Sequence, residues 1–565
     1  MLLTSTFLAL LLGTVWLEAA PHALTPTASR LVIGLSLLPM AATVRARSTR
    51  PIALAVGVGV VVSLVAAGVA IDTSYDGQEY QYDATWALVH GWNPLWLPYD
   101  RFIAPGATAL PWPQHYAWGT WLLLALVDGA GLSSEAAKGI FIVPAIGAGL
   151  VWYAVLRDVA SIRTSLRVLL ALLAAASPTV LVEFPTRMND GVMASLASAF
   201  VGFGLLYVRR GGATALGGMA AALALAVDTK FNALPIFGAL TAGFCLAALL
   251  QAGWGRTIRL GAMMAGTTLA AVLVLGWHPY VTNAIAHGNP FWPVGDPAYE
   301  INTVFVPRWL RSEPVVVQTV YSVASRVGES LAPKWPFTLT KAELGRLNGD
   351  TYWGAFGPWF SGAALLALLA GGATSMSPIA RRRALPLLSV AAFALLSVAI
   401  VPQSWIARFV PQLWLAVFLL GLAALYAQTR LVRGVGAACL LALGVNSGLA
   451  LLAVSYAEVK AVVAIDRSVS VAQQAGAICA DFGSSHARIG LLRSRGVQVY
   501  PLHSRFSLQC AGAEPIPYVH DFLHVPRMAC PCDEVGHDPT GAWHAPPDTT
   551  PQDIEERRQF PGAGD

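Results

Sequence analysis

Long apolar stretches recur along most of the chain, and short polar segments separate them. A helix needs about 20 residues to cross the hydrocarbon core of a bilayer, with a usual range of about 17 to 25. The pattern predicts about thirteen such helices. The first run has neither a basic start nor a good cleavage site, so we expect a retained helix rather than a signal peptide. The predicted spans are residues 2–20, 30–44, 51–71, 137–156, 168–184, 191–208, 213–227, 231–250, 260–279, 354–371, 384–401, 409–427 and 434–456.

Clusters of arginine occupy every second connection between these runs. Lys and Arg in short loops stay on the cytoplasmic side of a membrane, so these clusters set the orientation of the chain. Thirteen crossings with the clusters inside predict a cytoplasmic N-terminus and an extracytoplasmic C-terminus. The clusters comprise Arg45, Arg47, Arg50, Arg157, Arg163, Arg167, Arg209, Arg210, Arg256, Arg259, Arg381, Arg382, Arg383, Arg430 and Arg433.

The predicted fold is an all-α polytopic membrane protein with juxtamembrane helices in its outer loops and a small C-terminal α+β appendage. Aromatic residues such as Trp112, Tyr116, Trp118 and Trp121 favour outer helices at the level of the lipid headgroups. The expected parts are two N-terminal transmembrane helices (1–50), a transmembrane module (51–456) with outer loops 72–136 and 280–353, a small extracytoplasmic domain (457–545) and a disordered tail (546–565).

The composition agrees with a membrane protein. Of the 565 residues, 12% are charged, whereas soluble domains carry about 25%, and 56% are hydrophobic. This is more apolar surface than one soluble core of that size buries. The balance of charge is only +5, which is too small for a polyanion partner. A soluble enzyme, a nucleic-acid-binding protein and a disordered chain are therefore excluded.

Four acidic residues follow the third predicted span, at Asp72, Asp76, Glu79 and Asp83. Ionisable groups at the membrane are costly and are more often functional than accidental. Asp76, Glu79 and Asp83 have the spacing of one helix face. The alternative is that Asp76 or Asp72 only caps a juxtamembrane helix.

With Tyr80, Gly91 and Pro94, Asp76 resembles the first outer loop of the GT-C superfamily of polytopic glycosyltransferases, which includes the protein O-mannosyltransferases and the lipid A aminoarabinose transferases. The later segments that resemble this superfamily are Pro111–Trp118, Phe184–Gly191 with Asp190, Asp228–Phe231 with Lys230, Gly288–Pro293 and Trp405–Pro411 with Arg408. The Lys-Pro-Pro of those relatives is absent from the second segment. The resemblance covers roughly residues 51 to 427.

The resemblance implies transfer of a sugar from a polyprenyl-phosphate donor to a lipid, glycan or protein acceptor on the extracytoplasmic face of a bacterial inner (cytoplasmic) membrane. Asp76 is the candidate general base. Glu79 or Asp190 would stabilise charge at the sugar, bind its hydroxyls or raise the proton affinity of Asp76. A lipid phosphate needs cationic partners, for which we favour Arg408, although an arginine snorkelling to the headgroups is the alternative. The substrate-binding candidates are Tyr80, His115, Arg187, Lys230 and Arg408.

Several alternatives stay open at this stage. A divalent metal ion is one, because some members of the superfamily use a metal and an acidic cluster supplies oxygen ligands. Zinc is disfavoured, since His115 has no paired histidine at helical spacing. A polysaccharide polymerase or ligase is the main alternative function. A lipid-linked glycan flippase is less favoured, because almost no ionisable residues occur within the spans.

Four cysteines, Cys479, Cys510, Cys530 and Cys532, lie in the outer tail. An even number in an oxidising compartment predicts two disulfides with three possible pairings. The Cys530-Pro531-Cys532 segment is too tight to close on itself, so each of its cysteines would pair with Cys479 or Cys510. A metal site with histidines of the tail is the rival interpretation. Alternating apolar residues within 487–500 predict two short strands in this domain.

Overall fold

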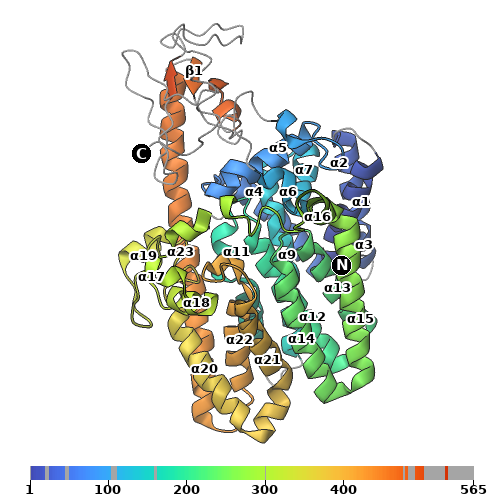
Figure 1. Ribbon diagram of the computed structural model, residues 1–565, viewed down its shortest axis with the longest axis vertical. Coiled ribbons are helices and arrows are strands. Elements are labelled where there is room, and N and C mark those ends of the chain that lie inside the picture. The colour runs from blue at the N-terminus through green and yellow to red at the C-terminus, as the bar shows by residue number, and fades with distance from the viewer. Residues whose placement is uncertain are drawn as a thin grey trace. The chain divides into compact units, whose positions relative to one another are not determined.

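The computed structural model describes residues 2–19, 24–44, 50–102, 111–157, 162–299, 301–474, 477–480, 490, 492–501 and 529–531 (Figure 1). The described residues form two compact units: a helical unit that extends to Val463 and a small C-terminal unit that begins at Ala464. The protein is a polytopic, all-helical membrane protein in its larger unit.

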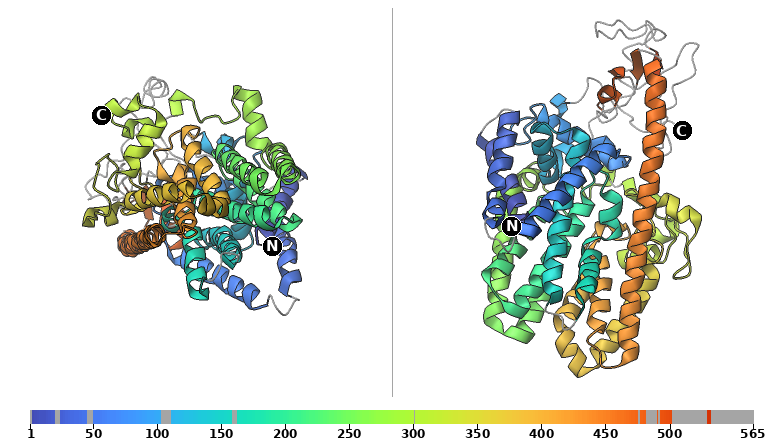
Figure 2. Two further views of the ribbon diagram at one scale, coloured as in Figure 1. Left: turned by 90° about the horizontal axis from the view of Figure 1, so that it is seen from below. Right: turned by 180° about the vertical axis from the view of Figure 1, so that it is seen from behind.

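Seven of the described helical stretches are long and apolar enough to cross a membrane. Three of them are assembled from consecutive shorter helices. The seven are α4 (Arg50–Val69), α8 (Ser134–Ala137) with η3 (Lys138–Phe141) and α9 (Ile142–Arg157), α12 (Asp190–Arg210), α14 (Ala233–Ala252), α15 (Trp254–Ala270) with η4 (Ala271–Leu275), α21 (Pro378–Leu396) with η8 (Ser397–Ala399), and α23 (Arg430–Gln474). Figure 2 shows α23 as one continuous helix.

The other predicted spans correspond to shorter helices. The shorter apolar helices are α1 (Leu2–Ala19), α7 (Gly119–Gly129), α10 (Thr164–Ala175), α13 (Ala213–Val227), α20 (Phe360–Met376) and α22 (Gln412–Ala424). The predicted run 30–44 is broken at Leu37 into α2 (Pro26–Ser36) and α3 (Leu38–Val44). The run 168–184 breaks at Ser177, whose hydroxyl group caps α11 (Pro178–Glu183). These two runs are therefore not single spans.

The core of the helical unit surrounds α12, most of which is buried. It packs against α9, α13, α14 and α22 (Figure 1). By contrast, α4 and α15 expose most of their apolar side chains. Apolar residues on all sides of a helix are typical of contact with protein on one side and lipid on the other. Positive backbone φ angles at Gly211 (71°) and Gly253 (82°) end α12 and α14, a conformation that glycine adopts without strain.

Short helices fill the long connections. The first contains η1 (Gly77–Gln81), α5 (Tyr82–Val89), η2 (Tyr99–Phe102) and α6 (Trp112–His115). The second contains η5 (Trp277–Val281), α16 (Thr282–His287), η6 (Pro297–Tyr299), η7 (Ile301–Phe305), α17 (Arg308–Arg311), α18 (Val315–Val323) and α19 (Lys341–Arg346); η9 (Ala407–Phe409) precedes α22.

Two aromatic residues of the first connection are buried inside the protein, whereas the prediction exposes their rings to lipid headgroups. Trp118 and Trp121 are fully buried, at 1% and 0% exposure. The indole nitrogen of Trp118 donates to the carbonyl oxygen of His278 at 2.7 Å, and that of Trp121 donates to Gln81. Both residues therefore belong to the core that α7 forms inside the segment predicted as a loop.

The C-terminal unit contains three short strands, β1 (Ala477–Ala480), β2 (Gln498–Pro501) and β3 (Ala529–Pro531), in the order β2-β1-β3. β1 pairs in parallel with β2 and antiparallel with β3, and Cys479 lies opposite Cys530. β2 covers the second predicted strand. At the first, Gly490 and Leu492 are helical, so that prediction is wrong at these positions. Cys510, Cys532 and the tail 546–565 lie outside the described residues.

Candidate functional site

Charged residues from five distant segments gather where helices of the larger unit begin or end. Asp76 precedes η1, Asp190 is the first residue of α12, and Lys230 follows α13. Arg408 lies in η9, and Asp350 lies in the connection between α19 and α20. We call these five residues, together with Glu183 described below, the Arg408 cluster. All of them lie outside the apolar interior of the helices, so the fold can bring them together at one end of the helices.

The guanidinium group of Arg408 is the centre of this cluster. Its Nη1 atom lies 3.2 Å from Oδ2 of Asp76 and 3.7 Å from Oδ1 of Asp350. The same nitrogen donates a hydrogen bond to the carbonyl oxygen of Gly349 at 3.3 Å. Arg408 is 7% exposed, and its Nε atom makes no hydrogen bond. The headgroup-snorkelling alternative for Arg408 is therefore disfavoured, because the side chain is buried and paired with carboxylates.

Lys230 and Asp190 form a second ion pair of the cluster. The ammonium group of Lys230 also lies 4.4 Å from the centre of the Phe409 ring, which is next to Arg408 in the chain. The amide group of Asn232 donates to the carbonyl oxygen of Phe409 at 2.7 Å. These contacts hold the segment after α13 against η9, so both cations of the cluster are fixed relative to each other.

The loop that carries Asp76 is shaped by Asp72. Oδ1 of Asp72 accepts hydrogen bonds from the backbone nitrogen of Ser74 (3.0 Å) and from its hydroxyl group (2.6 Å). Gly77, the residue after Asp76, lies so close to this turn that a Cβ atom there would lie 2.2 Å from the Ser74 hydroxyl oxygen. Asp76 itself makes no capping hydrogen bond. Asp72 thus has a structural role, whereas the carboxylate of Asp76 contacts Arg408.

The cluster shifts the proton affinities of its members. Burial opposes the charge on Arg408, but the surrounding carboxylates outweigh it and raise the pKa of Arg408. Burial raises the pKa of Asp350 to about 7, with Arg408 opposing the rise and Asp76 adding to it. Burial and nearby carboxylates also raise the pKa of Tyr80 and of Tyr116 well above the usual value. Both tyrosines therefore stay protonated and can donate hydrogen bonds.

Arg187 belongs to a neighbouring ion-pair network. Its backbone nitrogen donates to Oδ2 of Asp72 at 2.7 Å, and its guanidinium group lies 3.5 Å from the same oxygen. Nη2 lies 2.9 Å from Glu135, which also pairs with Lys138. The side chain of Arg187 therefore joins α8 to the Asp72 loop, and its predicted role in substrate binding stays a prediction.

The ring of His115 contacts residues of the second long connection. Its Nδ1 atom lies 2.9 Å from the amide oxygen of Asn283, and the ring packs edge-on against Trp292 at 4.2 Å.

Glu79 is buried in η1, which has π-helical rather than α-helical spacing, so Asp76, Glu79 and Asp83 do not have the predicted spacing of one helix face. The ion pairs described for the Arg408 cluster do not include His115 or Glu79.

The sequence interpretation missed Asp350 and Glu183. Glu183 ends α11, is 2% exposed, and accepts a hydrogen bond from the backbone nitrogen of Gly191 through Oε2 at 2.6 Å. Burial and the neighbouring Asp190 raise its pKa well above the usual value. An acid at the end of an apolar run is a signal that could have identified Glu183. Asp350 lies in the middle of a long loop and has no such signal.

Among the described residues, no group of three or more His, Cys, Asp or Glu side chains has the geometry to hold a metal ion. Three of the cluster's carboxylates instead face ammonium or guanidinium groups. The arrangement of these residues thus favours recognition of an anion or of a hydroxyl group.

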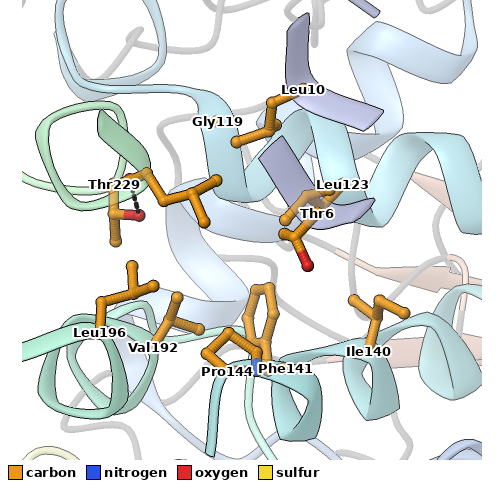
Figure 3. Close-up of a pocket in the computed structure, with 11 residues that line it drawn as sticks. Thr6, Leu10, Gly119, Leu123, Ile140, Phe141, Pro144, Val192, Leu196 and Thr229 are labelled. Atoms are coloured by element: carbon orange, nitrogen blue, oxygen red, sulfur yellow. Dashed lines mark hydrogen bonds between the residues drawn. The ribbon is translucent and has the colours of Figure 1, made fainter. Parts of the chain in front are cut away.

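A small apolar cavity, with room for only about one water molecule, lies beside the cluster (Figure 3). Leu10, Leu123, Phe141 and Leu196 are among the residues that line it, together with Thr229, the residue before Lys230. The hydroxyl group of Thr229 donates to the carbonyl oxygen of Leu225 at 2.7 Å. The cavity therefore offers few polar groups and does not suit a sugar.

Comparisons with known proteins assign no family to this chain. No family model, no curated protein and no solved structure matches it. The chemistry of the site consequently rests on the residues of the chain itself, which is a multi-pass membrane protein with an all-helical larger unit.

Proposed function

We propose that the protein is a GT-C-like membrane glycosyltransferase that transfers a sugar from a polyprenyl-phosphate donor to an acceptor on the extracytoplasmic face of a bacterial cytoplasmic membrane. The observation that carries this proposal is the position of the Asp76 carboxylate at the end of the helices. It lies 3.2 Å from the buried guanidinium group of Arg408, in the same cluster as the ion pair of Lys230 with Asp190.

In this proposal, Asp76 is the general base. It accepts the proton of an acceptor hydroxyl group while the hydroxyl oxygen forms a bond to the anomeric carbon of the sugar. The bond from that carbon to the phosphate oxygen breaks, and its electrons leave with the lipid phosphate. Arg408 and Lys230 stabilise the negative charge that develops on the leaving group. The ion pair of Arg408 with Asp76 opens when the phosphate binds, which frees the base.

Asp190 is the second acid of the proposal. Its ion pair with Lys230 places it at the cation that would face the phosphate. From there it can accept hydrogen bonds from sugar hydroxyl groups or stabilise positive charge at the anomeric carbon. Glu79 keeps its sequence-based assignment as a further catalytic candidate.

The test uses the purified full-length chain in nanodiscs with a panel of undecaprenyl-phosphate sugars. Consumption of the donor is measured with membrane extract as the source of acceptor. We expect Asp76→Asn to lower the rate at least about 100-fold, because general-base catalysis contributes about 10²- to 10⁴-fold. Asp190→Asn should also be strongly impaired.

The matched control is Asp100→Asn, since Asp100 is an exposed acid of the same outer connection. It should keep the wild-type rate. All variants should also keep the wild-type unfolding temperature within a few degrees. Full donor consumption by Asp76→Asn would show that the proposed mechanism is wrong.

A further inference from the structure

The charges of the Arg408 cluster do not balance if every acid is ionised. The cluster contains four carboxyl groups, Asp76, Glu183, Asp190 and Asp350, but only two cations, Arg408 and Lys230. Two positive and four negative charges give a net charge of −2, which would repel a phosphate group. Protonation of one acid would lower the net charge to −1 and weaken this repulsion, and the contacts of the four acids indicate which one holds a proton.

Glu183 is the acid of the cluster whose contacts stabilise a negative charge least. Asp76 and Asp350 face Arg408, and Asp190 is paired with Lys230. The one hydrogen bond described for the Glu183 carboxyl group comes from a backbone nitrogen, that of Gly191. A buried carboxylate without a cationic partner is costly, so such a group holds its proton. The raised pKa of Glu183 agrees with this, and burial is its main cause.

The second oxygen of Glu183 is the group available to a ligand. Oε1 is buried and makes no hydrogen bond. A Cβ atom at Gly349 would lie 3.5 Å from Cγ of Glu183, and Arg408 donates a hydrogen bond to the carbonyl oxygen of the same glycine at 3.3 Å, so Glu183 lies close to Arg408 without pairing with it. A buried donor without an acceptor is unfavourable, and an anionic oxygen held by the neighbouring cations would satisfy it.

We propose that Glu183 is a further ligand-binding residue of this site and that, as a neutral carboxylic acid, it donates a hydrogen bond from Oε1 to an oxygen of the lipid phosphate. This inference rests on the proposed function, because it takes the phosphate of the polyprenyl donor as the ligand. It gives the site three donors to the phosphate, the side chains of Arg408, Lys230 and Glu183, of which one carries no charge.

Two variants of Glu183 separate the neutral donor from other roles. Glu183→Gln keeps a neutral donor and an acceptor for the Gly191 nitrogen. Glu183→Met has a similar volume but lacks both. The probes are undecaprenyl phosphate and the uncharged undecaprenol, and their binding to the full-length protein in detergent is measured by native mass spectrometry at pH 7. The control pair is Glu313→Gln and Glu313→Met, at an exposed glutamate of the second outer connection.

We expect Glu183→Gln to bind undecaprenyl phosphate within about threefold of the wild type. Glu183→Met should bind it about tenfold more weakly, as the loss of a hydrogen bond to a charged group predicts, with undecaprenol binding unchanged. A merely structural role of Glu183 would weaken both lipids equally. Both control variants should match the wild type for both lipids.

The other outcomes would contradict either the inference about Glu183 or the proposed lipid-phosphate donor. If Glu183→Gln bound the phosphate at least tenfold more tightly, Glu183 would be ionised in the wild type and the inference would be wrong. Unchanged phosphate binding by Glu183→Met, or equal weakening of both lipids, would also refute it. If the wild type did not prefer the phosphate over the alcohol, the lipid-phosphate donor of the proposed function would itself be wrong, and the inference with it.

Discussion

The carboxyl group of Asp350 titrates near neutral pH, because burial raises its pKa to about 7. An aspartate in an unfolded chain has a pKa of about 3.9, so the folded state holds this proton more tightly. The stabilising effect of the bound proton is complete below about pH 4 and is lost as the pH rises through about 7. Asp350→Asn is always neutral, so we expect its unfolding temperature to exceed that of the wild type by an amount that grows from pH 5 to pH 8.

The measurement is a thermal unfolding series of both proteins in detergent across this range. Asparagine can still accept the hydrogen bond from the backbone nitrogen of Tyr75, which Asp350 accepts at 2.8 Å, so the local fold should persist. Asp100→Asn is again the control, and its curve should run parallel to that of the wild type. Parallel curves for the wild type and Asp350→Asn would contradict the raised pKa.

Among the helices, the contact of α12 with α14 depends on a glycine. A Cβ atom at Gly204 would lie 2.3 Å from Cζ of Phe244. The Phe244 ring cannot easily move away, because it is fully buried and packs against Phe200 at 6.1 Å. We expect Gly204→Ala to destabilise the protein by about 1–3 kcal/mol, the usual cost of overpacking. The measurement is the unfolding temperature of the purified variant.

Gly217→Ala in α13 is the matched control for this contact. No atom lies within 4 Å of the Cβ position at Gly217, and alanine is the better helix former. This variant should be neutral or more stable than the wild type. Equal unfolding temperatures for the two alanine variants would mean that α12 and α14 do not approach each other this closely.

Apolar runs predicted where most helices lie, but not where they break or how deeply they are buried. Hydropathy alone predicts one span over 168–184, because it does not register Ser177-Pro178, a pair that typically begins a new helix. The sequence assigns the region of α7 to headgroup-level helices rather than to the core, because tryptophans such as those at its start are typical of a membrane interface. In the fold, Trp118 and Trp121 instead find hydrogen-bond partners in the core, which depends on tertiary contacts.

The same limit applies to the site. Asp76, Asp190, Lys230 and Arg408 each stand at the end of an apolar run, so their positions in the sequence were sufficient to suggest a shared site. Their ion pairs and the direct contact of Arg408 with Asp76 follow only from the packing of α12, α13 and η9. Asp350 joins them from the middle of a loop, a position that local sequence cannot predict.

On the scale of the whole molecule, the Arg408 cluster and the predicted cytoplasmic arginines Arg209 and Arg210 lie at opposite ends of α12. α12 begins with Asp190 and ends with Arg209 and Arg210. Its 21 residues span about 31 Å, roughly the thickness of the hydrocarbon core. If the arginines are cytoplasmic, as basic residues in short loops usually are, the Arg408 cluster faces the extracytoplasmic side.

Two single-cysteine variants test this orientation, in a chain whose six native cysteines are replaced by alanine. Trp335 lies in the second long connection, and Met376 ends α20 shortly before the arginines of α21; both are 83% exposed. Because their exposure is equal, a difference in labelling reports the side of the membrane. In spheroplasts, we expect a membrane-impermeant maleimide to label Trp335→Cys at once and Met376→Cys only after permeabilisation. The reverse pattern would place the Arg408 cluster in the cytoplasm, where an extracytoplasmic acceptor could not reach Asp76.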